Sequence, residues 1–408
     1  MKKFLSVALG ILAAIGGFVD IGDLVFNTQA GAEFGFQLIW AVIVGVVGIV
    51  VFAEMCGRVA AVTGRPVMDV VRQRLGFGAG LLTMVGSVLL SVLTLGAEIG
   101  GLALVLELFF DAPYATLIVL AVLGIGLVAW FLPFEWIERI FGYMGLCLLV
   151  YLVAAIDLSP DWRNVADGFV PSIPGSSVAL YGYFVVGLIG AALMPYEVYF
   201  FSSGAIEERW TPKDLGVNRI NAIIGFGLGG LLSISLMIVA GVVWHPLGVQ
   251  PEMIGTVALG ANVPLGELGL LLALIGIAFA VSGAAIDTAF SAAYNLAQFF
   301  GWEWGKYREK RIAPRFTLSW LVALAVAYVV VSTGVDPVQL TEYSVVFSVV
   351  VLPLTYFPVL LVARDRTFMG QYANGRVASF LGWVYMGVIL IVAVAAIPLL
   401  IATNGGGG

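Results

Sequence analysis

Long apolar runs separated by short polar segments dominate the 408-residue sequence. A helix needs roughly 20 apolar residues to cross a hydrocarbon layer of about 30 Å. Eleven runs meet that length, at about 5–27, 36–58, 79–109, 114–132, 138–157, 179–204, 220–244, 265–299, 315–333, 338–362 and 379–402. The third and eighth runs are longer than needed, so we expect them to tilt or to extend past the membrane. The pattern predicts an all-α polytopic membrane protein with eleven transmembrane helices.

Composition supports this class and excludes a soluble domain. The chain is 61% hydrophobic and only 11% charged, whereas soluble domains carry about a quarter charged residues. Cys56 and Cys147 lie in apolar runs and indicate neither a disulfide framework nor a metal cluster. The single histidine, His245, is too isolated for a histidine-based metal site. Lys2-Lys3 leads directly into the first run, with no A-x-A-like cleavage site.

The basic residues predict the orientation of the chain. With the N-terminus in the cytoplasm, every one of the 19 Lys and Arg residues except Arg163 falls on the cytoplasmic side. Such a distribution is what the positive-inside rule requires, and a missed or invented span would scramble it. We therefore expect the C-terminus outside, ending in a flexible tail at 405–408, and a protein of the inner or plasma membrane.

The first run is interrupted by polar residues. Gly16-Gly17-Phe18-Val19-Asp20-Ile21-Gly22-Asp23 places two carboxylates and three glycines in an apolar segment. A charge at bilayer depth is costly and faces a cavity or a partner, and unwound backbone there is tolerated only inside protein or along a water-filled space. We expect Asp20 and Asp23 to lie at the break of a discontinuous helix and to bind a cation.

The sixth run contains a second interruption. It reads Gly190-Ala191-Ala192-Leu193-Met194-Pro195-Tyr196-Glu197, and a proline in a helix interior removes a hydrogen bond and clashes with the preceding turn. Two broken segments at matching positions in two halves indicate a secondary transporter built of inverted repeats, with its site between them. One transporter domain, 1–408, would then hold repeats at about 5–157 and 179–362 and an added helix at 379–402.

Several motifs resemble the NRAMP family of divalent-metal transporters. The family's first-helix Asp-Pro-Gly-Asn and the Gln-Ala-Gly-Ala-x-Phe-Gly-Tyr-x-Leu-x-Trp run after it correspond to Asp20–Asp23 and Gln29–Trp40. Its sixth-helix Met-Pro-His, with a following tyrosine and Ser-Ser pair, corresponds to Met194–Tyr196, Tyr199 and Ser202-Ser203. The resemblance implies a LeuT-type fold of eleven helices, in a 5+5 inverted repeat with helices 1 and 6 broken, and import of metal ions.

The resemblance also implies roles for individual residues. Asp20 matches the family's metal-binding aspartate, and Asp23 stands where the family has a metal-binding asparagine. Met194 matches the thioether ligand. Ala191 and, with weaker support, Gly17 match positions that offer backbone carbonyls.

The chain also departs from the family pattern. Ile21 replaces a proline, Asp23 an asparagine, Leu95 an aspartate, Tyr196 and Phe201 histidines, Glu197 an asparagine, and Val345 the glutamine that closes over the metal. Several groups tied to proton movement are therefore replaced, which leaves proton coupling open. Glu98, Tyr196 and Glu197 are the remaining candidates for a proton route or a pore lining. A related branch that includes magnesium carriers is the alternative.

The donor set defines the expected substrate and its competitors. Carboxylates and carbonyls suit Mg²⁺, Mn²⁺ or Ca²⁺, while the Met194 thioether favours Mn²⁺ or Fe²⁺. An organic-solute carrier of the same fold needs no acid pair with a methionine, and a metalloprotease needs a motif such as H-E-x-x-H. We therefore expect a carrier rather than an enzyme, with the metal ion as substrate and no resident cofactor. Membrane lipids are the expected surroundings; no nucleic acid and no obligate protein partner are indicated, and the roles of Asp287 and Glu342 stay open.

Overall fold

The computed structural model describes residues 19–172, 174, 177–251 and 254–406, and all regular elements in these ranges are helices. In chain order they are α2 (Ile21–Phe34), α3 (Ile39–Thr63), α4 (Val67–Glu107), α5 (Tyr114–Phe131), α6 (Phe134–Gly145), η1 (Leu146–Leu149), α7 (Val150–Asp157), α8 (Trp162–Asp167), α9 (Val178–Ala191), α10 (Pro195–Glu207), η2 (Pro212–Asp214), α11 (Leu215–Val243), η3 (His245–Leu247), α12 (Ile254–Phe300), α13 (Pro314–Ser332), α14 (Pro337–Arg364), α15 (Arg366–Met369), η4 (Gly370–Tyr372) and α16 (Arg376–Ala402). Helices dominate because no water is available in hydrocarbon to satisfy exposed backbone groups.

Ten helical segments of the described residues are long and apolar enough to cross a membrane. They coincide with the second to eleventh runs predicted from the sequence. Most of the first predicted run, 5–27, lies outside the described residues, and its described part forms the start of α2. The sixth run is two helices, α9 and α10, separated by residues 192–194, so the interruption predicted there is confirmed.

The helices that contain the third and eighth predicted runs, α4 and α12, are each a pair of helical segments joined at a glycine. α4 changes direction at Gly76, where φ is 80°, and α12 changes direction at Gly266, where φ is 63°. A positive φ is readily adopted by glycine and costs other residues. Gly76 precedes the predicted run at 79–109 and Gly266 lies at the start of the run at 265–299, so the kinks separate these runs from the helical segments before them.

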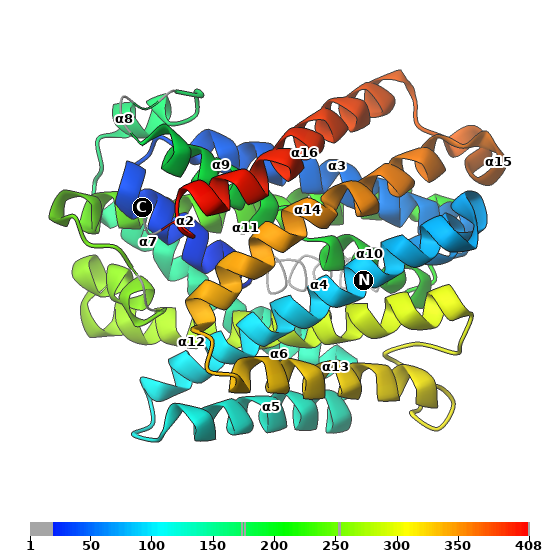
Figure 1. The fold of residues 1–408 in the computed structure, drawn as a ribbon, viewed down its shortest axis with the longest axis horizontal. Coiled ribbons are helices and arrows are strands. Elements are labelled where there is room, and N and C mark those ends of the chain that lie inside the picture. Colours follow the sequence, from blue (N-terminus) through cyan, green and yellow to red (C-terminus); the bar gives the residue numbers. More distant parts are fainter. Residues whose placement is uncertain (1–18, 173, 175–176, 252–253, 407–408) are drawn as a thin grey trace.

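The long helices α4 and α12 form the centre of the bundle. α12 and α14 pack against α4, while α2 packs against α11 and α9, and α10 lies between α3 and α12. In Figure 1, α5 and α13 lie side by side at one edge of the molecule, and α16 runs beside α14. The broken pair α9 and α10 and the start of α2 are thereby enclosed by other helices.

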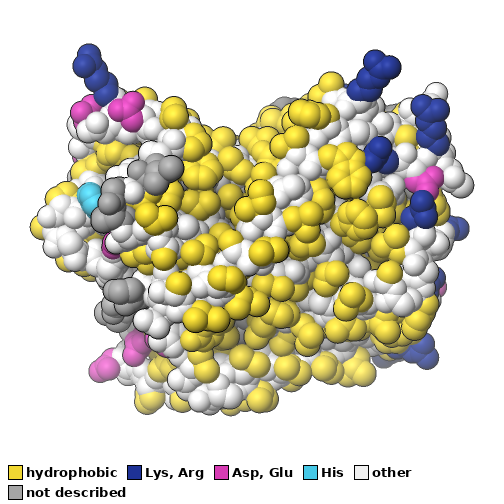
Figure 2. All heavy atoms as spheres, turned by 45° about the horizontal axis from the view of Figure 1, so that its top comes forward, with side chains coloured by type: hydrophobic (Ala, Val, Ile, Leu, Met, Phe, Trp, Pro, Cys, Tyr) yellow, Lys and Arg dark blue, Asp and Glu magenta, His cyan; other side chains and the backbone are white. Residues whose placement is uncertain are grey.

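Charge is separated from the apolar surface. On the face in Figure 2, hydrophobic side chains cover the middle, most Lys and Arg side chains lie toward the right, and the His side chain and most of the Asp and Glu side chains lie toward the left. Exposed aliphatic and aromatic side chains are numerous on α5, α13 and α16. A hydrophobic belt with charged ends is the surface expected for a protein that spans a membrane.

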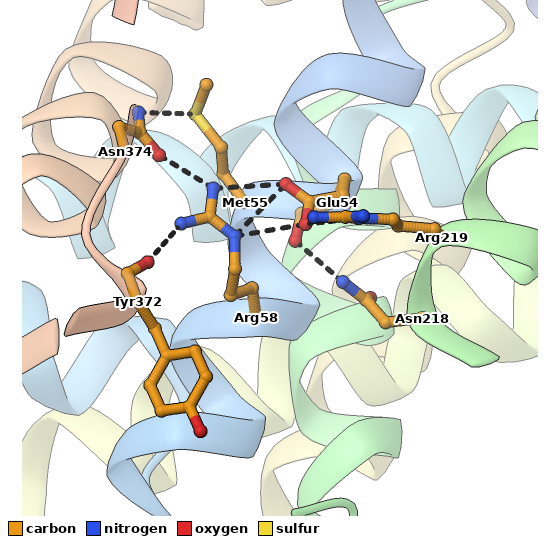
Figure 3. Close-up of polar contacts among 7 residues, drawn as sticks. All are labelled: Glu54, Met55, Arg58, Asn218, Arg219, Tyr372 and Asn374. Atoms are coloured by element: carbon orange, nitrogen blue, oxygen red, sulfur yellow. Dashed lines mark hydrogen bonds and ion pairs between the residues drawn. The ribbon is translucent and has the colours of Figure 1, made fainter. Parts of the chain in front are cut away.

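One buried arginine fixes the segment between α14 and α16. Arg58 of α3 is 6% exposed and binds Glu54 through Nε at 3.0 Å (Figure 3). It also donates to the carbonyl of Tyr372 at 2.7 Å and to Asn374 Oδ1 at 2.6 Å. Asn218 Nδ2 of α11 donates to the Glu54 carbonyl at 2.9 Å. The network joins α3, α11 and the segment before α16, and removing one partner of a buried pair is costly.

Close helix approaches in this bundle depend on glycine. A methyl group on Gly187 of α9 would lie 2.1 Å from the ring of Phe26 on α2, whereas one on Gly227 of α11 would have no neighbour within 4 Å.

We expect Gly187→Ala to destabilise the protein by about 1–3 kcal/mol through overpacking, lowering the Tm of the detergent-solubilised protein by about 2 °C or more. Gly227→Ala is the matched control and should not lower it, because alanine favours a helix over glycine. An unchanged Tm for Gly187→Ala would contradict this packing.

Candidate metal site at two helix breaks

Asp20 caps the N-terminus of α2. Its backbone is extended, with φ −89° and ψ −176°, and its Oδ1 accepts a hydrogen bond of 3.0 Å from the Asp23 N–H. A short acidic side chain at this position satisfies one of the unpaired N–H groups of the helix, and the positive end of the helix dipole favours its charge. The completely buried Asp20 carboxylate is thus held in place by the helix that it starts.

Asp23 lies in the first turn of α2 and has one oxygen available. Its Oδ1 accepts from Asn27 Nδ2 and from Ser233 Oγ of α11, both at 3.2 Å. Its Oδ2 is buried and has no hydrogen-bond partner among the described residues. A buried carboxylate oxygen without a donor is costly unless a cation or a proton occupies it.

The second break exposes a backbone carbonyl and a methionine. α9 ends at Ala191 and α10 begins at Pro195, with Met194 as the preceding residue. In a continuous helix the Ala191 carbonyl would accept from the N–H of residue 195, which proline does not have. Met194 is 1% exposed, so its thioether is directed into the protein. The break therefore places a backbone carbonyl without its helical donor and a buried thioether within four residues of each other.

The start of α2 and the break between α9 and α10 meet at Gly22. A methyl group built on Gly22 would lie 3.0 Å from Asp20 Oδ1, 3.7 Å from Met194 Cε and 3.1 Å from Val345 Cγ2 of α14. Tyr196 Oη donates to Asp20 Oδ2 at 3.4 Å. The structure thus brings together the residues predicted from the two interrupted runs. Gly17 lies outside the described residues.

Further carboxylates surround this point. Glu98 of α4 is completely buried; its Oε1 accepts from Thr288 of α12 at 3.2 Å, and its Oε2 has no partner within the described chain. Glu197 of α10 is 6% exposed, and neither of its oxygens is hydrogen-bonded in the described structure. Both acids are close enough to Asp20 for their charges to interact. This part of the molecule is built to hold positive charge.

A polar cavity opens from the other end of α2. It has a volume of about 650 Å³ and is lined by Gln29, Glu33, Asp336 and Glu342, with the tail at 404–406 at its rim. Gln29 Nε2 donates to Glu342 Oε1 at 3.4 Å. Glu342 therefore lines a vestibule, a role that the sequence did not assign.

The candidate donor groups are three hard oxygen donors and one soft sulfur donor. Two carboxylates and a carbonyl suit a hard divalent cation, and the thioether adds a preference for a softer one. No group of three or more His, Cys, Asp or Glu side chains suited to a metal occurs in the described part of the chain.

The described part of the chain combines ten membrane-length helices with buried acids beside a helix break, which is the architecture of a polytopic membrane transporter. Residues 10–398 match the family described as natural resistance-associated macrophage protein-like, Nramp. The chain belongs to this family, and the resemblance inferred from the motifs is confirmed.

Relatives and solved structures agree with this assignment. The "Divalent metal cation transporter MntH" of Deinococcus radiodurans is 26% identical over 93% of this chain and 86% of its own length. That of Verminephrobacter eiseniae is 28% identical over 88% and 81%. A manganese transporter of Eremococcus coleocola superposes with a TM-score of 0.75 at 19% identity, covering 98% of this chain and 92% of the other. The transporter Mhp1 gives 0.55 at 15% identity, covering 97% and 93%. The LeuT-type fold class is therefore confirmed, and the family is not one of enzymes.

Two residues of the site were missed by sequence reasoning. Asn27 follows Asp23 by four residues, a spacing that places both side chains on the same face of a helix. This spacing is the sequence signal that could have identified Asn27 as a neighbour of Asp23. Ser233 lies 210 residues from Asp23 on α11, and no local signal connects the two.

The Ser233 hydrogen bond provides a test of how Asp23 is oriented. We expect Ser233→Ala to weaken Mn²⁺ binding by about 10-fold, because partners that orient ligands typically contribute 10- to 100-fold in affinity. Calorimetric titration of the purified protein measures the Kd. Ser235→Ala is the matched control, since Ser235 lies on the same helix and donates only to the Leu231 carbonyl at 2.8 Å. Equal Kd values for both variants and the parent would show that Ser233 does not position Asp23.

Proposed function

We propose that this protein carries divalent metal cations into the cell by alternating access, with Mn²⁺ and Fe²⁺ favoured. The observation that carries the proposal is the meeting of Asp20 Oδ1 and Met194 Cε around Gly22, between two broken helices. The relatives named as divalent metal cation transporters support it. In this proposal Asp20, Asp23, the Met194 thioether and the carbonyls of Ala191 and Gly17 hold the ion.

The choice of ion depends on two opposing features. The Met194 sulfur favours a transition metal over Mg²⁺, which loses water reluctantly and prefers oxygen. Asp23 makes the site more negative and harder. An uncoupled magnesium carrier is therefore the second candidate, and it rests on Asp23 and on the replacement of proton-linked groups by Leu95 and Tyr196. Both replacing side chains are buried, at 0% and 1% exposed.

Proton movement is the finer part of the proposal. Asp23, Glu98 and Glu197 carry buried oxygens without hydrogen-bond partners in the described residues. When the metal leaves, protons are the smallest cations able to neutralise such groups. Glu98, Tyr196 and Glu197 are the proposed proton-accepting or pore-lining residues.

An organic-solute carrier of the same fold is the least favoured candidate. Such a carrier holds its substrate with helix ends and small polar groups. The contacts around Gly22 are instead a carboxylate, a methionine methyl and the Val345 side chain. This lining suits a small ion better than an amino acid.

The proposal also includes the orientation of the chain in the membrane and its division into two repeats. The basic residues place the N-terminus in the cytoplasm and the C-terminus outside, in the cell membrane. Residues 1–408 form one transporter domain with repeats at about 5–157 and 179–362 and an added helix at 379–402.

Uptake into proteoliposomes tests the function directly. We expect Mn²⁺ to enter, and Asp20→Ala to lower the rate at least about 10-fold, because removing one of two carboxylates leaves the ion poorly held. Asp111→Ala, which alters an exposed carboxylate, should leave the rate unchanged. A pH dye inside the vesicles reports whether protons enter with the metal.

The outcomes distinguish the candidates. Mn²⁺ entry with acidification supports a proton-coupled carrier, and entry of Mg²⁺ without acidification supports the uncoupled alternative. Entry of neither ion would overturn the metal proposal in favour of an organic solute.

The thioether provides a separate test of selectivity. We expect Met194→Ala to lower the ratio of Mn²⁺ to Mg²⁺ uptake by about 10-fold, because the variant keeps the oxygen ligands and loses the sulfur that favours Mn²⁺. Competition of Mg²⁺ against a fixed Mn²⁺ concentration measures this ratio. Met144→Ala serves as control, since Met144 is 40% exposed at the surface. An unchanged ratio would remove Met194 from the ligand set.

A further inference from the structure

A buried lysine joins three helices in the segment between α12 and α13. The Lys306 side chain is 2% exposed, and its Nζ lies 2.8 Å from Glu138 Oε1 of α6. The ammonium also lies over the rings of Phe134 and Phe200, at 3.8 and 4.9 Å from their centroids. A lysine removed from water in this way needs an ionic partner and aromatic faces to offset its desolvation.

The backbone of the same residue binds a second acid. The Lys306 N–H donates to Glu207 Oε1 at 2.8 Å, and this oxygen also accepts from Tyr294 Oη at 2.7 Å. Glu207 is the last residue of α10, and Tyr294 belongs to α12. Lys306 thus connects α6, α10 and α12 at one end of the bundle.

The ammonium of Lys306 is held in its charged form. Burial by itself would lower the pKa of Lys306, but the charges of Glu138, Tyr307 and Glu207 and the hydrogen bond to Glu138 outweigh it and raise this pKa above its ordinary value. The ion pair is therefore present throughout the neutral pH range.

The Lys306 cluster, made up of Lys306, Glu138, Glu207 and Tyr294, is connected to the proposed metal site through α10. α10 begins beside Met194 at the metal site and ends at Glu207 in the cluster. Asp287 of α12, one residue before Thr288, is close enough to Lys306 for their charges to interact. The polar cavity described above opens at the other end of the bundle. The Lys306 cluster thus ties helices together on the side away from the open vestibule.

We propose that Lys306, Glu138 and Glu207 form a latch that holds the cytoplasmic ends of α6, α10 and α12 closed, and that this latch must release before the ion can leave the site. The inference rests on the proposed transport function for its direction. The contacts that form the latch include none of the proposed metal ligands, so the latch is separate from the candidate metal site. Movement of one group of helices against another is the general mechanism of such folds, and the latch names the contacts that movement must break.

Accessibility of a buried cysteine tests the latch. Ser203 of α10 is completely buried and accepts a hydrogen bond of 2.8 Å from Gln298 of α12, so a thiol there reacts only when the two helices separate. In a background with Cys56 and Cys147 replaced by alanine, S203C would be treated with a soluble maleimide. We expect Lys306→Gln to increase the labelling rate about 10-fold or more, because breaking a buried ion pair strongly favours the open arrangement.

Two further variants make the result specific. Glu138→Gln should raise the labelling rate of S203C similarly. Lys306→Arg keeps the positive charge, so its labelling rate should lie closer to that of the parent than to that of Lys306→Gln. Arg308→Gln is the matched control, since Arg308 pairs with Glu303 in the same segment and both side chains are more than half exposed. Parent-like labelling in Lys306→Gln and Glu138→Gln, or an equal increase in Arg308→Gln, would overturn the latch.

The readout is independent of the proposed substrate. Labelling is measured without metal, and the melting temperature and Mn²⁺ affinity of each variant show whether it is folded. Failure of Mn²⁺ uptake would therefore leave the labelling result standing. Unchanged labelling with normal uptake would remove the latch and keep the transporter.

Discussion

The backbone of a helix cannot be interrupted inside a membrane unless the freed groups find partners. In this protein the start of α2 and the break between α9 and α10 lie side by side, with Asp20 and Met194 both close to Gly22. Asp20 satisfies the start of α2, and Tyr356 Oη donates to the Leu193 carbonyl at 3.0 Å within the second break. The Ala191 carbonyl is left without its helical donor because residue 195 is proline. The candidate site therefore forms where side chains satisfy some of the freed backbone groups and the Ala191 carbonyl keeps no helical donor.

Carboxylates outnumber cations around these breaks. Asp20, Asp23, Glu98 and Glu197 are all buried, and the described ion pairs of the chain lie elsewhere, at Arg58, Lys306 and other residues nearer the ends of helices. Charges of like sign at this depth repel one another and are poorly solvated. A divalent cation relieves both problems at once, which explains why so acidic a cluster occurs in an apolar bundle.

The sequence allowed ten of the helical spans and the interruption of the sixth run to be predicted, because apolar run length and Pro near an acid are local signals. Most of the first predicted run lies outside the described residues, so its interruption stays a prediction. The sequence did not reveal the kinks at Gly76 and Gly266, since hydropathy carries no information on φ. The pair Glu54 and Arg58 has the i,i+4 spacing of a helical ion pair, but its contacts with Tyr372 and Asn374 depend on tertiary packing. The same holds for Ser233 and for the vestibule, whose walls come from distant helices.

The polar cavity at the end of α2 has an electrostatic consequence of its own. Glu33, Asp336 and Glu342 line one cavity, and no Lys or Arg is among its lining residues in the described chain. A recess lined by one sign of charge concentrates counter-ions and raises their rate of arrival. That attraction is screened over about 8 Å at physiological ionic strength. Attraction of a cation into this cavity therefore weakens as the salinity of the medium rises, and a carrier that takes up its ion through the cavity, as proposed above, would load its site fastest in dilute surroundings.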